Sequence, residues 1–295
     1  MLIGVQDFIA GWIAGTTALA IGHPFDTIKV RQQVLHTRLF KAVKFTFKHE
    51  GIPGFYKGFV LPALMIGPSN AIFFGFYGGT MRFIGKEGQE GRVDLTDPNW
   101  ERNVFLAGTF AGFWQVIFTC PAELVKTLLQ MQTQNKNVWK SRYETDAKGI
   151  IDCLIKIWRG PGFKWYFRGI TPMMYRDCPT SGIYTLVYEW LVNCDYGYNI
   201  LNHKVVKQSF AGGTAGLLSW IFVVPLDVIK SRMQGDNMYN PQFRSMRHCV
   251  MSTYHEHGWQ YFFQGTWPVL VRSFPFNVAI FVTYEFVMDM FKLYT

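Results

Sequence analysis

The chain has 295 residues, of which 49% are hydrophobic, 17% aromatic and 17% charged, and its formal net charge is +9. Long uncharged segments alternate with short basic ones, which argues against an ordinary soluble protein, and the basic residues form no separate domain of the kind that binds nucleic acid. The five cysteines show no Cys-x-x-Cys spacing and predict reduced thiols, without a disulfide frame or a metal site.

The first segment, residues 8–25, contains no charged side chain and is long enough to cross a bilayer. Pro24 lies near its end, and Asp26, Lys29 and Arg31 follow it. An ionisable side chain at membrane depth costs about 2.5–3.5 kcal/mol on insertion scales, so such residues are functional candidates whose partners have to be found.

The same pattern occurs three times along the chain: a proline, an acid two residues later, a lysine five later and a glutamine nine later. The sets are Pro24, Asp26, Lys29, Gln33; Pro121, Glu123, Lys126, Gln130; and Pro225, Asp227, Lys230, Gln234. Each proline is preceded by a Gly-x-x-x-Gly pair, which lets helices approach closely in a membrane. These pairs are Gly11 and Gly15, Gly108 and Gly112, and Gly212 and Gly216. The copies predict three tandem repeats, at 1–98, 99–203 and 204–295.

A second anchor in each repeat is a glycine, Gly58, Gly169 or Gly265, which is followed by another apolar segment. We therefore predict an all-α membrane protein in which each repeat has two spanning helices joined by a connector with a short amphipathic helix. The six predicted spans are approximately 5–34, 61–83, 101–132, 171–192, 207–235 and 267–293. Pro24, Pro121 and Pro225 are expected to kink their helices.

The connectors within the repeats carry fifteen Lys or Arg residues, and those between the repeats carry fewer. By the positive-inside rule, the connectors within the repeats face the more negative compartment, and six spans place both termini on the other side.

The repeated motifs resemble those of the mitochondrial carrier family, and the resemblance covers the whole chain. PFDTIKVR with EGIPGFYKG fits the family pattern completely, whereas PAELVKTL with PGFKWYFRG and PLDVIKSR with HGWQYFFQG depart from it. Leu128, Pro161, His257 and Gln264 stand where the family has charged residues. The resemblance implies a pseudo-threefold, monomeric carrier of a small molecule in the mitochondrial inner membrane. Both termini would face the intermembrane space, the protein would be no enzyme, and it would need no cofactor, with cardiolipin bound near the glycine anchors.

The resemblance also implies a matrix gate. The acid, lysine and glutamine lie on one helix face, and the family pairs the acid of one repeat with the lysine of the next. The implied pairs are Asp26 with Lys126, Glu123 with Lys230, and Asp227 with Lys29, with Gln33, Gln130 and Gln234 on the same faces. The alternative is a pair within one helix, such as Asp26 with Lys29, that has no gating role.

An outer gate is implied at the other end of the even-numbered spans. The family motif places an aromatic residue and an acid there, and the matching residues are Tyr188, Glu189, Tyr284 and Glu285. Apolar residues, Met81, Val192 and Met288, occupy the basic places of that motif. We therefore expect a weak outer gate without a complete salt bridge.

The substrate pocket is predicted from residues at equal depth in the even-numbered spans. Met65, Arg176 and Arg272 each stand seven residues after a glycine anchor, and Asp177 adjoins Arg176. An arginine suits a carboxylate and Asp177 suits an ammonium group, with Asn70 as a further wall residue. The alternative is that Arg176, Asp177 and Arg272 pair only with one another. We expect these residues to select the substrate and the matrix gate to set the barrier to opening.

The residues around the pocket resemble the carnitine/acylcarnitine and basic amino-acid branch of the family, which includes solute carrier family 25 members 45, 47 and 48. That resemblance implies a substrate with a carboxylate, a positive nitrogen or both. The alternatives are a carnitine or acylcarnitine exchanger, a proton or anion leak protein, and a membrane adaptor that transports nothing.

Overall fold

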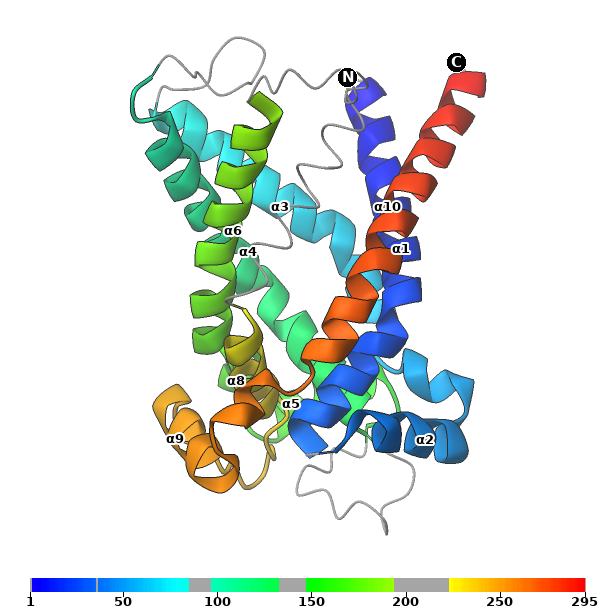
Figure 1. Cartoon of the computed structure of the whole chain (residues 1–295), viewed down its shortest axis with the longest axis vertical. Helices are drawn as coiled ribbons and strands as arrows, with labels where there is room; N and C mark the ends of the chain where they lie inside the picture. The colour runs from blue at the N-terminus through cyan, green and yellow to red at the C-terminus, as the bar shows by residue number, and fades with distance from the viewer. Residues whose placement is uncertain (1, 36, 85–96, 133–146, 194–222, 295) are drawn as a thin grey trace. The chain divides into compact units, whose positions relative to one another are not determined.

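The computed structural model describes residues 2–35, 37–84, 97–132, 147–193 and 223–294. All regular secondary structure in these ranges is helical, which confirms the predicted all-α class (Figure 1). The described helices form two compact units. The first contains the described residues of 1–68, 119–172 and 227–295, and the second those of 69–118 and 173–226. The helices α3, α4, α6 and α8 contribute residues to both units.

The long helices match the predicted spans. They are α1 (Leu2–Leu35), α3 (Val60–Ile84), α4 (Trp100–Met131), α6 (Ile170–Asn193) and α10 (Thr266–Tyr294). Within the described residues, Gln6–Val34, Ile52–Ile84 and Trp100–Met131 are long and apolar enough to cross a membrane by length and composition. Arg176 and Asp177 lie within α6, and Arg272 lies within α10. Most of the fifth predicted span lies outside the described residues, and its end forms α8 (Val224–Gln234).

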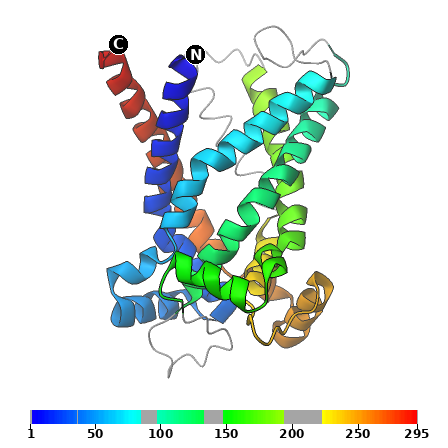
Figure 2. The same cartoon turned by 180° about the vertical axis from the view of Figure 1, so that it is seen from behind.

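Short helices follow the odd-numbered spans. They are α2 (Leu39–Glu50), η1 (Ile52–Tyr56), α5 (Ile150–Arg159), η3 (Phe163–Phe167), α9 (Met246–His257) and η5 (Trp259–Phe263). The helix α5 shows the predicted amphipathic character, because Cys153 and Ile157 are buried whereas the charged side chains of Asp152 and Lys156 are 36% and 33% exposed and Arg159 is exposed. In the first unit, α2, α5 and α9 lie at the end opposite both chain termini (Figure 1), and the view from behind agrees (Figure 2).

The predicted close approach at the Gly-x-x-x-Gly pairs is confirmed at three of the described glycines. A Cβ atom at Gly15 would lie 2.9 Å from Ile66 of α3, and one at Gly108 or Gly112 would collide with α6 near Ser181. The prediction is wrong for Gly11, where a Cβ atom would meet nothing within 4 Å. The third pair, Gly212 and Gly216, lies outside the described residues.

Each glycine anchor lies close to the first helix of the next repeat, which is α4, α8 or α1. Gly58, Gly169 and Gly265 have φ angles of 75°, 81° and 88°, which favour glycine over any residue with a side chain. A Cβ atom at Gly58 would lie 3.1 Å from the carbonyl oxygen of Lys126, and one at Gly265 would lie 3.0 Å from Nε2 of Gln33. The anchors thus set the distance between each connector and the residues of the predicted matrix gate.

The cysteines of the described ranges, Cys120, Cys153, Cys178 and Cys249, are free thiols as predicted, and Cys194 lies outside those ranges. Burial raises the pKa of the Cys153 and Cys249 thiols to about 11, so both stay protonated near neutral pH. These two side chains therefore act as small apolar groups beneath the amphipathic helices.

Candidate functional site

The first unit contains all three of the ion pairs that the repeat pattern predicts. Nζ of Lys126 lies 2.9 Å from Asp26, and Nζ of Lys230 lies 2.6 Å from Glu123. Lys29 pairs with Asp227 rather than with Asp26 of its own helix. In each pair, the lysine of one repeat meets the acid of the preceding repeat in cyclic order, so the pairs tie the three repeats together. We call these six residues the matrix ring.

The three glutamines of the pattern are fully buried and also reach the preceding repeat. Gln33 Nε2 donates to the carbonyl of Gln264 at 3.1 Å, Gln130 Nε2 to the hydroxyl of Thr27 at 3.3 Å, and Gln234 Oε1 accepts from Thr127 Oγ1 at 3.1 Å. Because they lie one turn beyond the lysines, they form a second set of contacts between repeats next to the ring.

Pro24 and Pro121 lie inside continuous helices, whereas Pro225 lies in the first turn of α8. A proline inside a helix leaves one carbonyl without its usual N–H donor. The sequence places a proline two residues before each acid of the ring, so any bend at these prolines would change the direction of the acid.

Asp26 has a second cationic partner, Arg272 of α10. Its two carboxylate oxygens are divided between them, because Oδ2 accepts from Lys126 and Oδ1 accepts from Arg272. The sequence placed Arg272 among the substrate contacts, apart from the gate. That separation is wrong for Arg272, because its side chain is long enough to reach the ring from α10.

The pair Arg176 and Asp177 lies on α6 in the second unit. Nε of Arg176 donates to Oδ1 of Asp177 at 2.5 Å and a terminal nitrogen donates to Oδ2 at 2.9 Å. The alternative that Arg176, Asp177 and Arg272 pair only with one another therefore fails, since Arg272 pairs with Asp26. Met65, on α3 in the first unit, is partly buried, and Asn70, in the second unit, is exposed.

The last basic residue of the repeated proline motif connects the first helix of its repeat to the connector helix. Arg31 donates to Thr46 and Glu50 of α2 at 2.6 and 2.7 Å. In the third repeat, Arg232 donates to Thr253 at 2.6 Å and to Glu256 at 3.2 Å. His257 occupies the expected acidic place there, so Glu256, one residue earlier, takes over the pair.

The second repeat replaces both members of this pair together. Leu128 stands at the basic place and Pro161 at the acidic place, and Leu128 packs in an apolar cluster with Val125, Cys153 and Ile157. The two departures from the family pattern are thus complementary. The apolar cluster around Leu128 stands where the first repeat has its ion pair.

The residue before each glycine anchor donates to a backbone carbonyl of the next repeat. The bonds run from Lys57 to Gln132 at 3.0 Å, from Arg168 to Met233 at 3.2 Å and from Gln264 to Thr37 at 3.1 Å. Gln264 therefore keeps this contact although it carries no charge.

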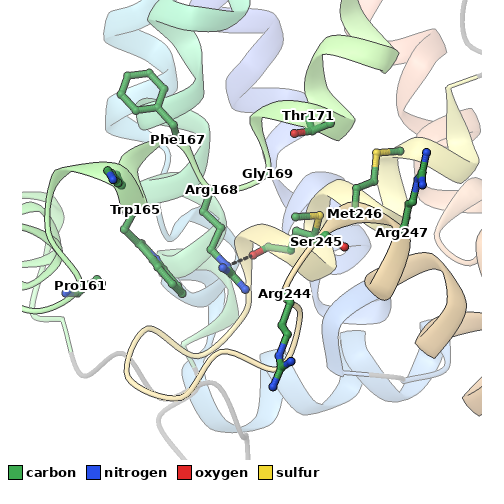
Figure 3. Close-up of a pocket in the computed structure, with 12 residues that line it drawn as sticks. Pro161, Trp165, Phe167, Arg168, Gly169, Thr171, Arg244, Ser245, Met246 and Arg247 are labelled. Atoms are coloured by element: carbon green, nitrogen blue, oxygen red, sulfur yellow. Dashed lines mark hydrogen bonds between the residues drawn. The ribbon is translucent and has the colours of Figure 1, made fainter.

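A pocket of about 600 Å³ lies beside the Gly169 anchor in the first unit. Trp165 and Arg168 come from one wall, and residues 244–247 from the other (Figure 3). Arg168 is held by Asp236 and by the carbonyl of Phe243. Three further cations line the pocket and are exposed: Lys164, Arg244 and Arg247.

The predicted outer-gate residues lie near the ends of α6 and α10. The hydroxyl of Tyr284 donates to Asp7 of α1 at 3.0 Å, and Glu285 is exposed. In the second unit, Tyr188 stacks on Tyr184 with ring centroids 6.3 Å apart, next to the partly buried Glu189. Sequence reasoning missed Asp7, which belongs to no repeated motif, and its only signal was an acid close to the start of an apolar span.

Comparisons with known proteins give a consistent result. The chain matches the family described as Mitochondrial carrier protein over residues 4–88, 100–195 and 202–295. It is 36% identical to the Mitochondrial basic amino acids transporter of Rattus norvegicus, covering 97% of this chain and 90% of that protein. It is 35% identical to Solute carrier family 25 member 45 of Mus musculus, covering 98% and 99%, and 32% identical to member 48 of the same species, covering 95% and 94%.

Proposed function

The chain belongs to the mitochondrial carrier family, and from that premise we propose that it moves a small metabolite bearing a carboxylate and a positively charged nitrogen by alternating access. Membership establishes a transporter rather than an enzyme, with six spanning helices in three tandem repeats in the mitochondrial inner membrane. The proposal concerns the substrate class, the residues that bind it, the gates, the lipid and the monomeric state.

The observation that carries the proposal is the position of Arg272. It lies inside a spanning helix, its side chain is 20% exposed, and its guanidinium already binds the carboxylate of Asp26. A guanidinium that is exposed in part can bind a second carboxylate, and its planar fork holds that group in two hydrogen bonds. A charged residue at this depth is a functional candidate by default.

The remaining proposed contacts rest on the sequence argument and on local chemistry. Asp177 is 27% exposed, so part of its carboxylate can accept a bond from an ammonium group while Arg176 holds the rest. Met65 and Asn70 are proposed as wall residues that limit the size of the substrate. A substrate with both charges also agrees with the printed name of the rat relative, the Mitochondrial basic amino acids transporter.

The test is uptake of labelled arginine, lysine and carnitine into proteoliposomes that contain the purified carrier. We expect saturable uptake of at least one, reduced about tenfold or more in Arg272→Ala and in Asp177→Ala, because each loses a charge-assisted contact of about 1.5–3 kcal/mol. Arg159→Ala, which removes an exposed arginine at the end of α5, is the matched control and should transport normally.

Three outcomes would change the proposal. Intact uptake in both variants would contradict the substrate contacts. Uptake of carnitine and acylcarnitines alone would identify a carnitine-type exchanger. Movement of protons or anions without any organic substrate would indicate a leak protein.

We propose that the matrix ring and the three buried glutamines close the matrix side, and that Tyr188, Glu189, Tyr284 and Glu285 close the outer side. Both chain ends lie at the end of the first unit away from the connector helices (Figure 1), which supports a common side for the termini. The basic connectors favour the matrix for the other side, so that the termini face the intermembrane space.

The pocket beside Gly169 is proposed to bind the phosphate groups of cardiolipin. The helix α9 begins at Met246, which lines this pocket together with the three exposed cations. A helix N-terminus with basic side chains nearby is a favourable site for phosphate. The equivalent anchors Gly58 and Gly265 are proposed to offer related sites.

Cardiolipin should raise the unfolding temperature of the purified carrier in detergent, and the double variant Arg244→Gln, Arg247→Gln should lose at least about half of that increase. Phosphatidylcholine serves as the lipid control. Lys156→Gln is the protein control, because Lys156 is a cation of α5 that pairs with Asp152 and does not line the pocket. An equal increase in the double variant would rule out this pocket.

A further inference from the structure

Asp26 connects the matrix ring to a residue outside the repeated motif. Its carboxylate is 9% exposed and lies between Lys126 and Arg272, which come from the second and third repeats. At the position on α3 that is equivalent to Arg272, the chain has Met65, which carries no charge. A substrate that binds Arg272 can therefore change an ionic contact of the ring. A substrate that contacts the uncharged Met65 cannot do so in this way.

Gly22 provides the space through which Arg272 reaches Asp26. It is buried one turn before Asp26 on α1, and a Cβ atom there would lie 3.1 Å from Nε and 3.3 Å from Cδ of Arg272. These distances are shorter than ordinary van der Waals contact, so the arginine would have to shift by a few tenths of an ångström for a Cβ atom and further for a larger side chain such as valine. Gly22 acts here through its missing side chain, because its helical backbone needs no special φ angle.

Phe276 supports the same arginine from the other side. It follows Arg272 by one turn of α10, and the guanidinium carbon lies 4.7 Å from the centroid of its ring. A Cβ atom at Gly22 would also lie 3.1 Å from this ring. The guanidinium therefore lies against an aromatic face that favours a cation, close to the surface of α1.

We propose that Gly22 and Phe276 are positioning residues that hold Arg272 on Asp26, and that a substrate carboxylate competes with Asp26 for this guanidinium. A substrate that takes Arg272 removes one of the two cations bound to Asp26, which weakens the ring and lowers the cost of opening the matrix side. The second half of this proposal rests on the proposed function, whereas the positioning of Arg272 does not.

The positioning is tested without any substrate, by a double-mutant cycle on the unfolding temperature. Gly22→Val should lower this temperature in the wild-type background, and part of the decrease should disappear in the Arg272→Ala background, because the clash with Arg272 is then absent while the clash with the Phe276 ring remains. Gly11→Val is the matched control, since Gly11 lies on the same helix with open space around it. An equal decrease in both backgrounds would show that Gly22 only packs α1, and would overturn the proposal.

The competition is tested by the kinetics of uptake. Once displaced from Asp26, Arg272 should bind the substrate without competition, so KM should fall about threefold or more in Gly22→Val, whereas kcat should change little because the substrate-bound ring lacks the arginine in both proteins. Phe276→Leu, which keeps an apolar side chain, should also lower KM and covers the case in which Gly22→Val does not fold. A raised KM with unchanged kcat in Phe276→Leu would overturn the competition.

If no tested compound is taken up, the proposed function fails. The double-mutant cycle still decides whether Gly22 positions Arg272, because it requires no substrate. The two failures can therefore be distinguished.

Discussion

Replacing Asp26 with asparagine is expected to reduce uptake about tenfold or more and to lower the unfolding temperature of the carrier. The change leaves Lys126 and Arg272 close together without the carboxylate that both of them bind. Removing one partner from a buried ion pair costs about 3–5 kcal/mol, because the remaining charge stays desolvated. Here two cations lose their partner at once, so we expect this to be the largest single effect in the matrix ring.

Glu123→Gln is the matched control for this prediction. The Glu123 side chain is 32% exposed and pairs with Lys230, so water can compensate for much of the lost charge. Asp26→Glu keeps the charge and should recover part of the uptake. If Glu123→Gln reduced uptake and stability as much as Asp26→Asn does, the shared position of Asp26 between two cations would have no special role.

The ring pairs could be predicted from the sequence because they depend on a repeated spacing. Three copies of one pattern fix the same helix face in each repeat, and the resemblance to a known family supplies the direction in which the repeats meet. The pairing of Lys29 with Asp227, 198 residues apart, was obtained in this way.

The contacts that the sequence did not predict are those that break the repeat. Arg272 reaches Asp26 because Gly22 lacks a side chain, and no spacing rule relates these three residues. Glu256, one residue before His257, pairs with Arg232 in place of the acid expected at His257. A long side chain such as that of Arg232 can pair with an acid one residue away from the expected position. A comparison of motifs does not take the length of the side chain into account.

From the sequence alone, the departures of the second repeat from the family pattern are visible only as the loss of one basic and one acidic residue. By their positions in the repeat, Leu128 and Pro161 replace a basic and an acidic residue that pair with each other in the first repeat, and Leu128 packs in an apolar cluster. A buried ion pair can be exchanged for an apolar contact at little cost if both charges are removed together. The chain thus contains both arrangements, an ion pair in the first and third repeats and an apolar contact in the second.

Arg31→Leu is expected to be the most destabilising change outside the ring. The Arg31 side chain is 2% exposed and donates to Thr46 and Glu50, and also to the carbonyls of Gln130 and Gln132 at 3.0 and 3.2 Å. Leucine would leave these acceptors and the buried carboxylate of Glu50 short of a donor. The expected loss is about 3–5 kcal/mol of folding free energy, measured by denaturant unfolding of the purified carrier.

The double variant Arg31→Leu, Glu50→Leu should recover a substantial part of that loss, because it reproduces the apolar solution of the second repeat. Lys57 also pairs with Glu50, at 3.0 Å, but its side chain is 26% exposed and can turn to water when the acid is removed. Lys41→Leu, at an exposed position of α2, controls for the added apolar surface. A double variant no more stable than Arg31→Leu alone would show that the buried carboxylate is not the main cost, and that the lost bonds to the carbonyls of Gln130 and Gln132 are.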